Sequence, residues 1–278
     1  GLWNLVPQVD AFATESVEVL KGPTSVLYGS APPGGMVNQT AKQPRSKRET
    51  VLRARIGTDA LRELALDSTG PLSPELDYRL IAMVRERDGQ QATTEEERRL
   101  IAPSLTWRIS PATRLNLNLY YQNDPALIPS TPLPALGTLR QAPYGLLDSD
   151  AFAGDAGWSG MRREVTMAGW KFEHAFNDSL SFLQNFRYTK ADGFQRNTYN
   201  NGLLADNRTL SRSAYFTDEA QTGWVADNQL AWRVNTGALA HRILAGVDYQ
   251  RLRSRVGYGG TLGTGTPSLG LAAPDHHL

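Results

Sequence analysis

Hydrophobic and polar residues alternate along most of the chain after about residue 49, which is the pattern of half-buried β-strands. The clearest stretch runs from Arg114 to Gln122, where Leu115, Leu117 and Leu119 fall on one face and mostly polar residues on the other. No stretch of useful length shows a helical period. We therefore expect nine antiparallel strands, this one and eight others around residues 52–56, 63–67, 78–85, 101–109, 167–173, 180–189, 224–234 and 242–250.

The links between the expected strands alternate in length. From residues 70–74 onward, every second link is a short turn built from Gly, Pro, Asn, Asp and Ser. The links between these turns are long, over residues 88–97, 125–161 and 192–212. Barrels of the outer membrane have short turns at one end and long loops at the other, whereas a soluble sandwich or propeller has no reason to sort its loops in this way.

The two faces of the expected strands differ in chemistry. The apolar faces carry aromatic residues near their ends, as the interfacial girdles of a membrane barrel do. The opposite faces are rich in Arg, Asn, Gln, Asp and Thr, which suits a hydrated lumen. A soluble sheet with one solvated face is the alternative, but nine such strands without a helix would need a second sheet to cover them. The girdle residues are Trp107, Tyr121, Trp170, Trp224, Trp232 and Tyr249.

Composition narrows the function classes. The 278 residues include 29 Lys and Arg against 28 Asp and Glu, and this balance argues against a nucleic-acid binder. The absence of Cys excludes disulfides, thiolate zinc sites and cysteine nucleophiles. Four His remain, none in an HExxH spacing, and no run of about 18 apolar residues predicts a spanning helix. The mean hydropathy of −0.40 does not exclude a barrel, because alternation averages out.

The first 44 residues follow another pattern. Residues 18–29 read Glu-Val-Leu-Lys-Gly-Pro-Thr-Ser-Val-Leu-Tyr-Gly, and residues 34–38 read Gly-Gly-Met-Val-Asn. They predict a short strand near residues 17–20, a turn, a short helix or turn over residues 24–28, and a second strand over residues 36–40. Neither a phosphate-binding loop nor a serine-nucleophile elbow is present, so an enzyme is not expected.

This N-terminal block closely resembles the C-terminal part of the plug domain in TonB-dependent outer-membrane receptors. Downstream, Trp158 and residues 203–212, 227–230 and 246–250 look like barrel segments of the ferrichrome and hydroxamate-siderophore branch. The resemblance implies an all-β membrane fold, a 22-stranded antiparallel barrel occluded by a plug. Residues 1–44 would form the later part of the plug and residues 45–278 about nine barrel strands.

Both ends of the chain read as interrupted, so we expect a fragment that lacks the energy-coupling box, the first half of the plug and the remaining strands. The resemblance implies a Gram-negative outer-membrane receptor, in contact with lipid, that binds a ferric siderophore. The TonB–ExbB–ExbD complex would supply the energy for import. The iron would stay in its chelator, so neither a cofactor nor a protein metal site is expected.

Other functions remain as alternatives. A receptor of the same fold could import haem, cobalamin or a glycan, although haem is disfavoured because no His lies in the long links. A passive porin-like barrel is disfavoured by the plug motif. Two local features have plain interpretations: Glu95 to Arg99 is expected to be a solvated loop face, and the pair His276 and His277 a frayed end.

Aromatic residues are the expected ligand contacts, because they bind large, partly apolar iron chelates at low entropic cost. By alignment of the plug motif, Trp3 falls at an apical position that is aromatic in the resembling branch. For any single loop aromatic, packing is the competing interpretation. The further ligand candidates are Tyr120, Tyr144, Trp158, Phe194 and Tyr199. Structural roles in the plug are expected for Lys21, which stands where Arg is commoner, and for Gly22, Pro23, Tyr28, Gly29, Gly34, Gly35 and Asn38.

Overall fold

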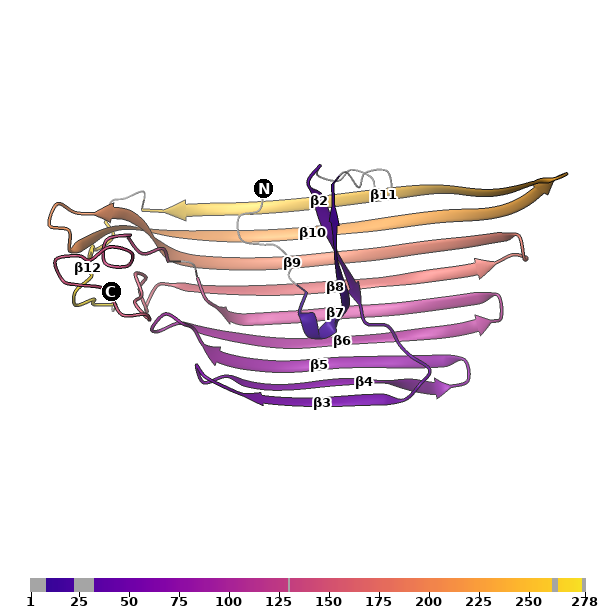
Figure 1. Ribbon diagram of the computed structural model, residues 1–278, viewed down its shortest axis with the longest axis horizontal. Helices are drawn as coiled ribbons and strands as arrows, with labels where there is room; N and C mark the ends of the chain where they lie inside the picture. Colours follow the sequence, from indigo (N-terminus) through magenta and orange to yellow (C-terminus); the bar gives the residue numbers. More distant parts are fainter. Residues whose placement is uncertain (1–8, 23–32, 130, 262–264, 277–278) are drawn as a thin grey trace.

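The computed structural model of the protein describes residues 9–22, 33–129, 131–261 and 265–276. Within these ranges nine antiparallel strands, β3 to β11, form one curved sheet in sequence order (Figure 1). The short strand β12 pairs with the first two residues of β10, Thr209 and Leu210. The nine strands expected from the alternation are therefore confirmed. No helix in the described ranges is long and apolar enough to cross a membrane.

The wall strands lengthen from 8 residues in β3 to 28 residues in β10, and short turns join them at one end of the sheet. The turns β4–β5, β6–β7, β8–β9 and β10–β11 all lie at the right in Figure 1, and the longer links lie at the left. The strands are β3 (Glu49–Ile56), β4 (Arg62–Ser73), β5 (Leu76–Asp88), β6 (Glu95–Ser110), β7 (Thr113–Leu127), β8 (Gly160–Ala175), β9 (Leu180–Leu203), β10 (Thr209–Thr236), β11 (Leu239–Gly260) and β12 (Leu269–Gly270).

The long link expected between β9 and β10 is not found in the structure. Residues 192–212 are not a long link, because β9 and β10 stay paired through them, as Phe194 with Asp218 and Asn197 with Tyr215. Only residues 204–208 remain outside the two strands. The sequence pattern misses this extension because both faces of the strands are polar there. Backbone hydrogen bonds continue a ladder without an apolar face, so the period-2 signal disappears before the strand ends.

The faces of the sheet are inverted relative to a soluble sheet. Residues on the apolar face lie on the outer, convex side and are exposed: Leu52 at 70% and Val247 at 72%. On the inner side Gln122 and Asp124 are fully buried. The assignment of faces from the sequence is thus confirmed, and it indicates a wall with lipid outside and polar contents inside.

Pro103 interrupts one ladder of the sheet. Between β6 and β7 the register runs from Ile101 with Tyr121 to Ser104 with Asn118, and the two intervening pairs are missing from it. Proline has no N–H to donate. On its other side Pro103 still pairs with Leu80 of β5, so the strand continues.

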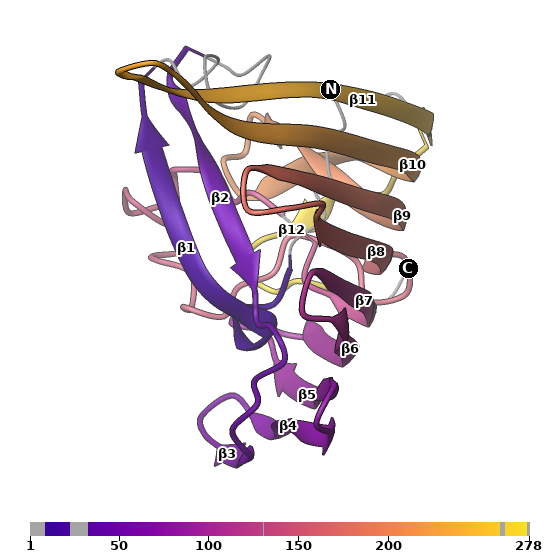
Figure 2. The same ribbon diagram turned by 90° about the vertical axis from the view of Figure 1, so that its right-hand side faces the viewer.

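A two-stranded hairpin crosses the inner face of the sheet steeply. It consists of β1 (Thr14–Lys21) and β2 (Gly35–Ala41), preceded by the 3-10 helix η1 (Ala11–Ala13). Figure 2 shows the hairpin on the concave side, away from the convex apolar surface. The two short strands expected near residues 17–20 and 36–40 are confirmed. The helix or turn expected over residues 24–28 lies outside the described residues.

Glycine is required at the start of β2. Gly35 has a φ of +112°, and a Cβ on it would lie 2.0 Å from the carbonyl oxygen of Leu20 on the paired strand. Gly34 has open space around it. Of the two adjacent glycines in the motif, the second is therefore the one that the hairpin geometry demands.

Candidate functional site

The hairpin is anchored to the wall by a line of buried charges. The carboxylate of Asp10, just before η1, accepts a hydrogen bond from the N–H of Phe12 at 2.9 Å and one from Nη1 of Arg98 on β6 at 2.7 Å. Arg98 also donates from Nε to Oδ1 of Asp124 on β7 at 2.7 Å. Asp124 in turn accepts from Nη2 of Arg163 on β8 at 2.9 Å. Two anions and two cations thus alternate from the plug into the wall.

The interpretation of Glu95 to Arg99 as a solvated loop face is wrong, because all five residues lie in β6. Arg98 departs furthest from it, since its side chain is on the inner face and the residue is 9% exposed. The run of charges hides the alternation, because Glu96 and Arg98 point inward while Glu97 and Arg99 point outward. A period-2 analysis of charged positions as well as apolar ones would have separated them.

Tyr120 belongs to the same interface. Its hydroxyl accepts a hydrogen bond from the backbone N–H of Asp10 at 2.9 Å and donates one to Gln122. The side chain is on the inner face, as the alternation predicts, and is 9% exposed. In this structure Tyr120 contacts the plug segment, and its predicted contact with ligand stays a prediction.

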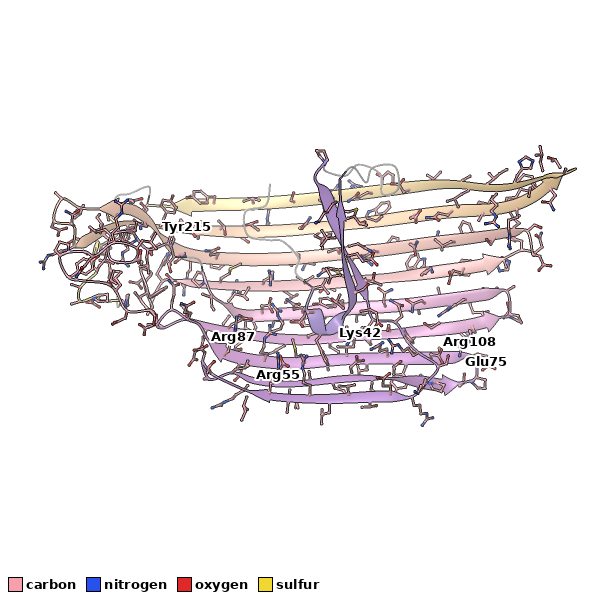
Figure 3. The ribbon with its side chains drawn as sticks, viewed as in Figure 1. Lys42, Arg55, Glu75, Arg87, Arg108 and Tyr215 are labelled. Carbon is pink, nitrogen blue, oxygen red and sulfur yellow. The ribbon has the colours of Figure 1, made fainter. Side chains whose placement is uncertain are left out.

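A second cluster anchors the same end of the hairpin, where the chain leaves β2 beside the start of β1. Nζ of Lys42, directly after β2, donates to Oδ2 of Asp67 at 2.9 Å, and Arg79 binds the same carboxylate with two bonds of 2.8 and 2.7 Å. Figure 3 shows Lys42 at the foot of the hairpin, beside the wall strands. Farther along, the hydroxyl of Ser46 donates to Asp77 at 2.9 Å.

The charges at the foot of the hairpin are fixed by their partners. Burial alone raises the pKa of Asp10, but the N–H of Phe12 and the guanidinium of Arg98 outweigh it and hold that pKa below its usual value. Buried ion pairs add little net stability. Removing one partner nevertheless leaves the other charge buried and unpaired, which destabilises the folded state by about 3–5 kcal/mol. The two clusters therefore specify where the plug sits on the wall more than they stabilise it.

The long link over residues 128–159 folds into a compact unit at the end of the sheet. Ala153 of this link packs in a buried cluster with Leu210, Leu269 and Leu271. The fully buried guanidinium of Arg212 donates to the carbonyl groups of Ala153, Gly154 and Pro267 at 2.9–3.3 Å. Segments from three parts of the chain are thereby held together.

Two of the candidate aromatics take part in this packing. Tyr144 packs against the buried cluster, and its hydroxyl donates to the carbonyl of Leu136 at 3.4 Å. Nε1 of Trp158 donates to the carbonyl of Asn197 at 3.1 Å. Tyr199 differs from both, because 59% of it is exposed.

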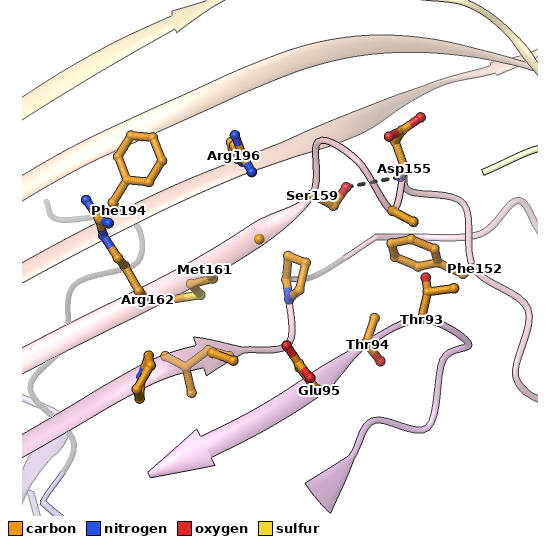
Figure 4. Close-up of a pocket in the computed structure, with 16 residues that line it drawn as sticks. Thr93, Thr94, Glu95, Phe152, Asp155, Ser159, Met161, Arg162, Phe194 and Arg196 are labelled. Atoms are coloured by element: carbon orange, nitrogen blue, oxygen red, sulfur yellow. Dashed lines mark hydrogen bonds between the residues drawn. The ribbon is translucent and has the colours of Figure 1, made fainter. Parts of the chain in front are cut away.

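Phe194 lies on the outer face. Phe194 is eight residues after Phe186 in the same strand, so the two side chains lie on the same face. Phe186 pairs with the outward-facing Trp170 of β8, and Phe194 pairs with Arg162 of that strand. The guanidinium of Arg162 lies 5.2 Å from its ring. Figure 4 shows this pair at the rim of a pocket beneath the long link, with Glu95 opposite. The described aromatic candidates are therefore distributed over several environments.

The plug motif is described in part. Lys21, Gly22, Gly34, Gly35 and Asn38 lie in or beside the hairpin, and the amide of Asn38 donates to Glu18 at 3.3 Å across the two strands. Trp3, Pro23, Tyr28 and Gly29 lie outside the described residues. Among the residues that the structure does describe, no group of three or more His, Cys, Asp or Glu is placed to hold a metal ion.

Two family models match the chain. Residues 105–276 match the model described as TonB dependent receptor-like, beta-barrel, and residues 4–36 match that of the TonB-dependent Receptor Plug Domain. The chain is 36% identical over 255 residues to the ferrioxamine B receptor of Salmonella typhimurium strain SL1344, covering 91% of this chain and 36% of that protein. It is 30% identical over 267 residues to the ferrichrome outer membrane transporter/phage receptor of Escherichia coli K12, covering 89% and 36%.

A solved structure shares the architecture. The ferric-catecholate import receptor Fiu of Escherichia coli K12, in its open form, superposes with a TM-score of 0.84 at 25% identity. The match covers 98% of this chain and 44% of that one. The chain spans 36% of the length of each of the two curated relatives above.

Proposed function

Because this chain belongs to the TonB-dependent receptor family, we propose that the whole protein is an outer-membrane receptor that imports a ferric siderophore. The observation that carries the proposal is the docking of the plug hairpin on a polar inner wall whose outer face is apolar. A passive pore has no use for a plug tied to its wall by buried charges.

The ligand class proposed is an iron(III) hydroxamate chelate. Two of the relatives are named for ferrioxamine B and ferrichrome, and both names support this class. Iron would enter inside its chelator, so the receptor performs no covalent chemistry and needs no resident cofactor. Energy would come from the TonB–ExbB–ExbD complex.

The domain division is proposed at residue 44. Residues 1–44 would belong to the plug and residues 45–278 to the barrel, a boundary supported by the change from the hairpin to the first wall strand at Glu49. Trp3 is the first proposed ligand contact. Tyr199 of β9 is the candidate whose exposure suits a direct contact, and Tyr120 would act by holding the plug segment that follows Trp3.

Uptake in a deletion strain tests the proposal. Cells that lack the full-length gene should take up iron-labelled ferrioxamine B at a background rate, and the gene on a plasmid should restore uptake. The same plasmid in a strain without TonB is the matched control and should restore binding at the cell surface without uptake. Normal uptake of labelled hydroxamate and catecholate chelates in the deletion strain would falsify the assignment.

A further inference from the structure

The buried charges that anchor the plug continue to the base of the longest link. Asp124 is near the end of β7 and Arg163 near the start of β8, so this ion pair brackets residues 128–159. Arg98 joins Asp124 to Asp10 with N–O distances of 2.7 Å on both sides. One set of charges therefore contacts the plug segment and both stems of the link, that is, the end of β7 and the start of β8.

All four side chains are nearly excluded from solvent. The side chains of Arg98, Asp10, Asp124 and Arg163 are 10%, 7%, 0% and 5% exposed. Leaving any of these charges unpaired is costly in a buried site. A movement of Asp10 away from Arg98 would remove one of the two carboxylates bound to that guanidinium and leave Asp10 with Arg85 at 3.6 Å, so the charge balance at Asp124 and Arg163 would change with it.

The link is built to follow its stems as a unit. Its residue Ala153 is held by Arg212, and the carbonyl of Asp150 accepts a hydrogen bond at 2.7 Å from the N–H of Ala92, in the neighbouring β5–β6 link. Thr131 likewise donates to Gln91 of that link at 2.9 Å. A displacement of β7 and β8 at the stems would therefore be transmitted to these packed segments, because hydrogen bonds hold the link to its neighbours.

We propose that Arg98 and Asp124 are positioning residues that couple the plug segment at Asp10 to the external link over residues 128–159. The purpose of the coupling rests on the proposed function: ligand captured at the outer end would bias the plug, and the plug would bias the link. Such coupling is reciprocal, and a buried network with alternative arrangements is a physical carrier for it.

A fluorophore on the link measures the coupling in the full-length receptor. Ser149 is exposed and contributes only its backbone carbonyl to a hydrogen bond, so the Ser149→Cys variant can carry the label. In the ligand-free receptor, Asp10→Asn and Asp124→Asn should each lower the anisotropy of this label. The double variant should lower it no further than the stronger single one, because both changes cut the same connection.

Ligand adds a second readout. Addition of iron(III) ferrioxamine B should change the label's emission, and both variants should reduce that change about fivefold or more, the lower range of typical allosteric couplings. Asp124→Glu should restore it, because the charge returns. Asp77→Asn is the matched control: Asp77 is a buried carboxylate on the same face, bound to Arg108 at the opposite end of the sheet, and its variant should behave as the unmodified receptor.

The two proposals fail in different ways. Unchanged ligand-free anisotropy in Asp10→Asn, which leaves the wall intact, would overturn the coupling. An equal loss in Asp77→Asn would also overturn it, since the effect would then be general loosening. Failure of the labelled receptor to bind any ferric siderophore, with the anisotropy effects present, would instead count against the proposed function and support the coupling.

Discussion

The hydroxyl of Tyr120 on the wall accepts a hydrogen bond at 2.9 Å from the backbone N–H of Asp10 in the plug segment. The two residues are 110 positions apart in sequence, and both are buried. A backbone amide offers no side chain to alter, so Tyr120 is the member of this contact that mutation can remove.

Tyr120→Phe should loosen the plug without affecting the barrel. The substitution leaves the buried N–H of Asp10 without an acceptor, which costs about 1–3 kcal/mol. Urea-induced release of the plug, followed by protease sensitivity of the hairpin, should shift to lower urea. Tyr121→Phe is the control, because Tyr121 is on the outer face and its hydroxyl makes a longer bond of 3.3 Å to Glu164. Equal shifts for both variants would contradict the prediction.

Gly35→Ala should disrupt the hairpin, and Gly34→Ala should not. A Cβ at residue 35 meets the carbonyl oxygen of Leu20 at 2.0 Å and must also adopt a positive φ, which costs about 1–2 kcal/mol by itself. Residue 34 has open space. Permeability of intact cells to a large antibiotic reports a displaced plug, and it should rise for the first variant alone.

Acid should weaken the anchoring of the plug through Asp10. The pKa of this carboxyl is lowered in the folded protein, because the N–H of Phe12 and Arg98 outweigh its burial. Its contribution is therefore complete above the unfolded pKa of about 3.9 and is lost as pH falls through the lower folded value. Protease sensitivity of the hairpin between pH 5 and pH 2 should rise in the unmodified receptor, and part of that pH dependence should be absent from Asp10→Asn.

Trp3→Ala should weaken ligand binding about tenfold or more while the barrel assembles normally, since loss of a buried aromatic anchor commonly costs at least 1–2 kcal/mol. Titration of purified receptor with iron(III) ferrioxamine B measures the affinity. Trp232→Ala on the outer face is the control and should bind as the unmodified receptor does. An unchanged affinity in the Trp3 variant removes this residue from the site.

Arg212→Met should release the external segments from one another. The buried guanidinium makes four hydrogen bonds to the carbonyls of Ala153, Gly154 and Pro267, and methionine replaces none of them. Limited proteolysis should then cut near residues 153–154 and 267 at least several-fold faster. Arg233→Met, near the short turns, removes an exposed arginine and should leave those cleavage rates as they are.

The wall could be predicted from the sequence because each strand repeats one rule. Leu115, Leu117 and Leu119 face outward, and the residues between them face inward, so the period alone fixes the faces. The same rule fails where the outer face of a strand is not apolar. Residues 192–212 have no apolar side to reveal that they are still strands.

The plug contacts could not be predicted in the same way. Asp10, Arg98 and Asp124 look like ordinary surface charges in sequence, and their significance depends on pairing across 88 and 26 positions. The motif near Gly35 did identify the hairpin, because a steric requirement acts locally. The presence of an aromatic side chain did not predict the environment of a ligand candidate. Phe194 lies on the outer face of the sheet, whereas Tyr199, the next candidate along the chain, is exposed.

The length of β10 sets the height of the receptor above its membrane. Its 28 residues, at about 3.3 Å each, reach about 90 Å along the strand, whereas about 9–11 residues suffice to cross the apolar layer. Paired β9 rises beside it almost as far. The paired strands β9 and β10 are therefore long enough to extend well beyond the apolar layer as a rigid, hydrogen-bonded sheet. An arriving molecule would contact this sheet before it reached the plug.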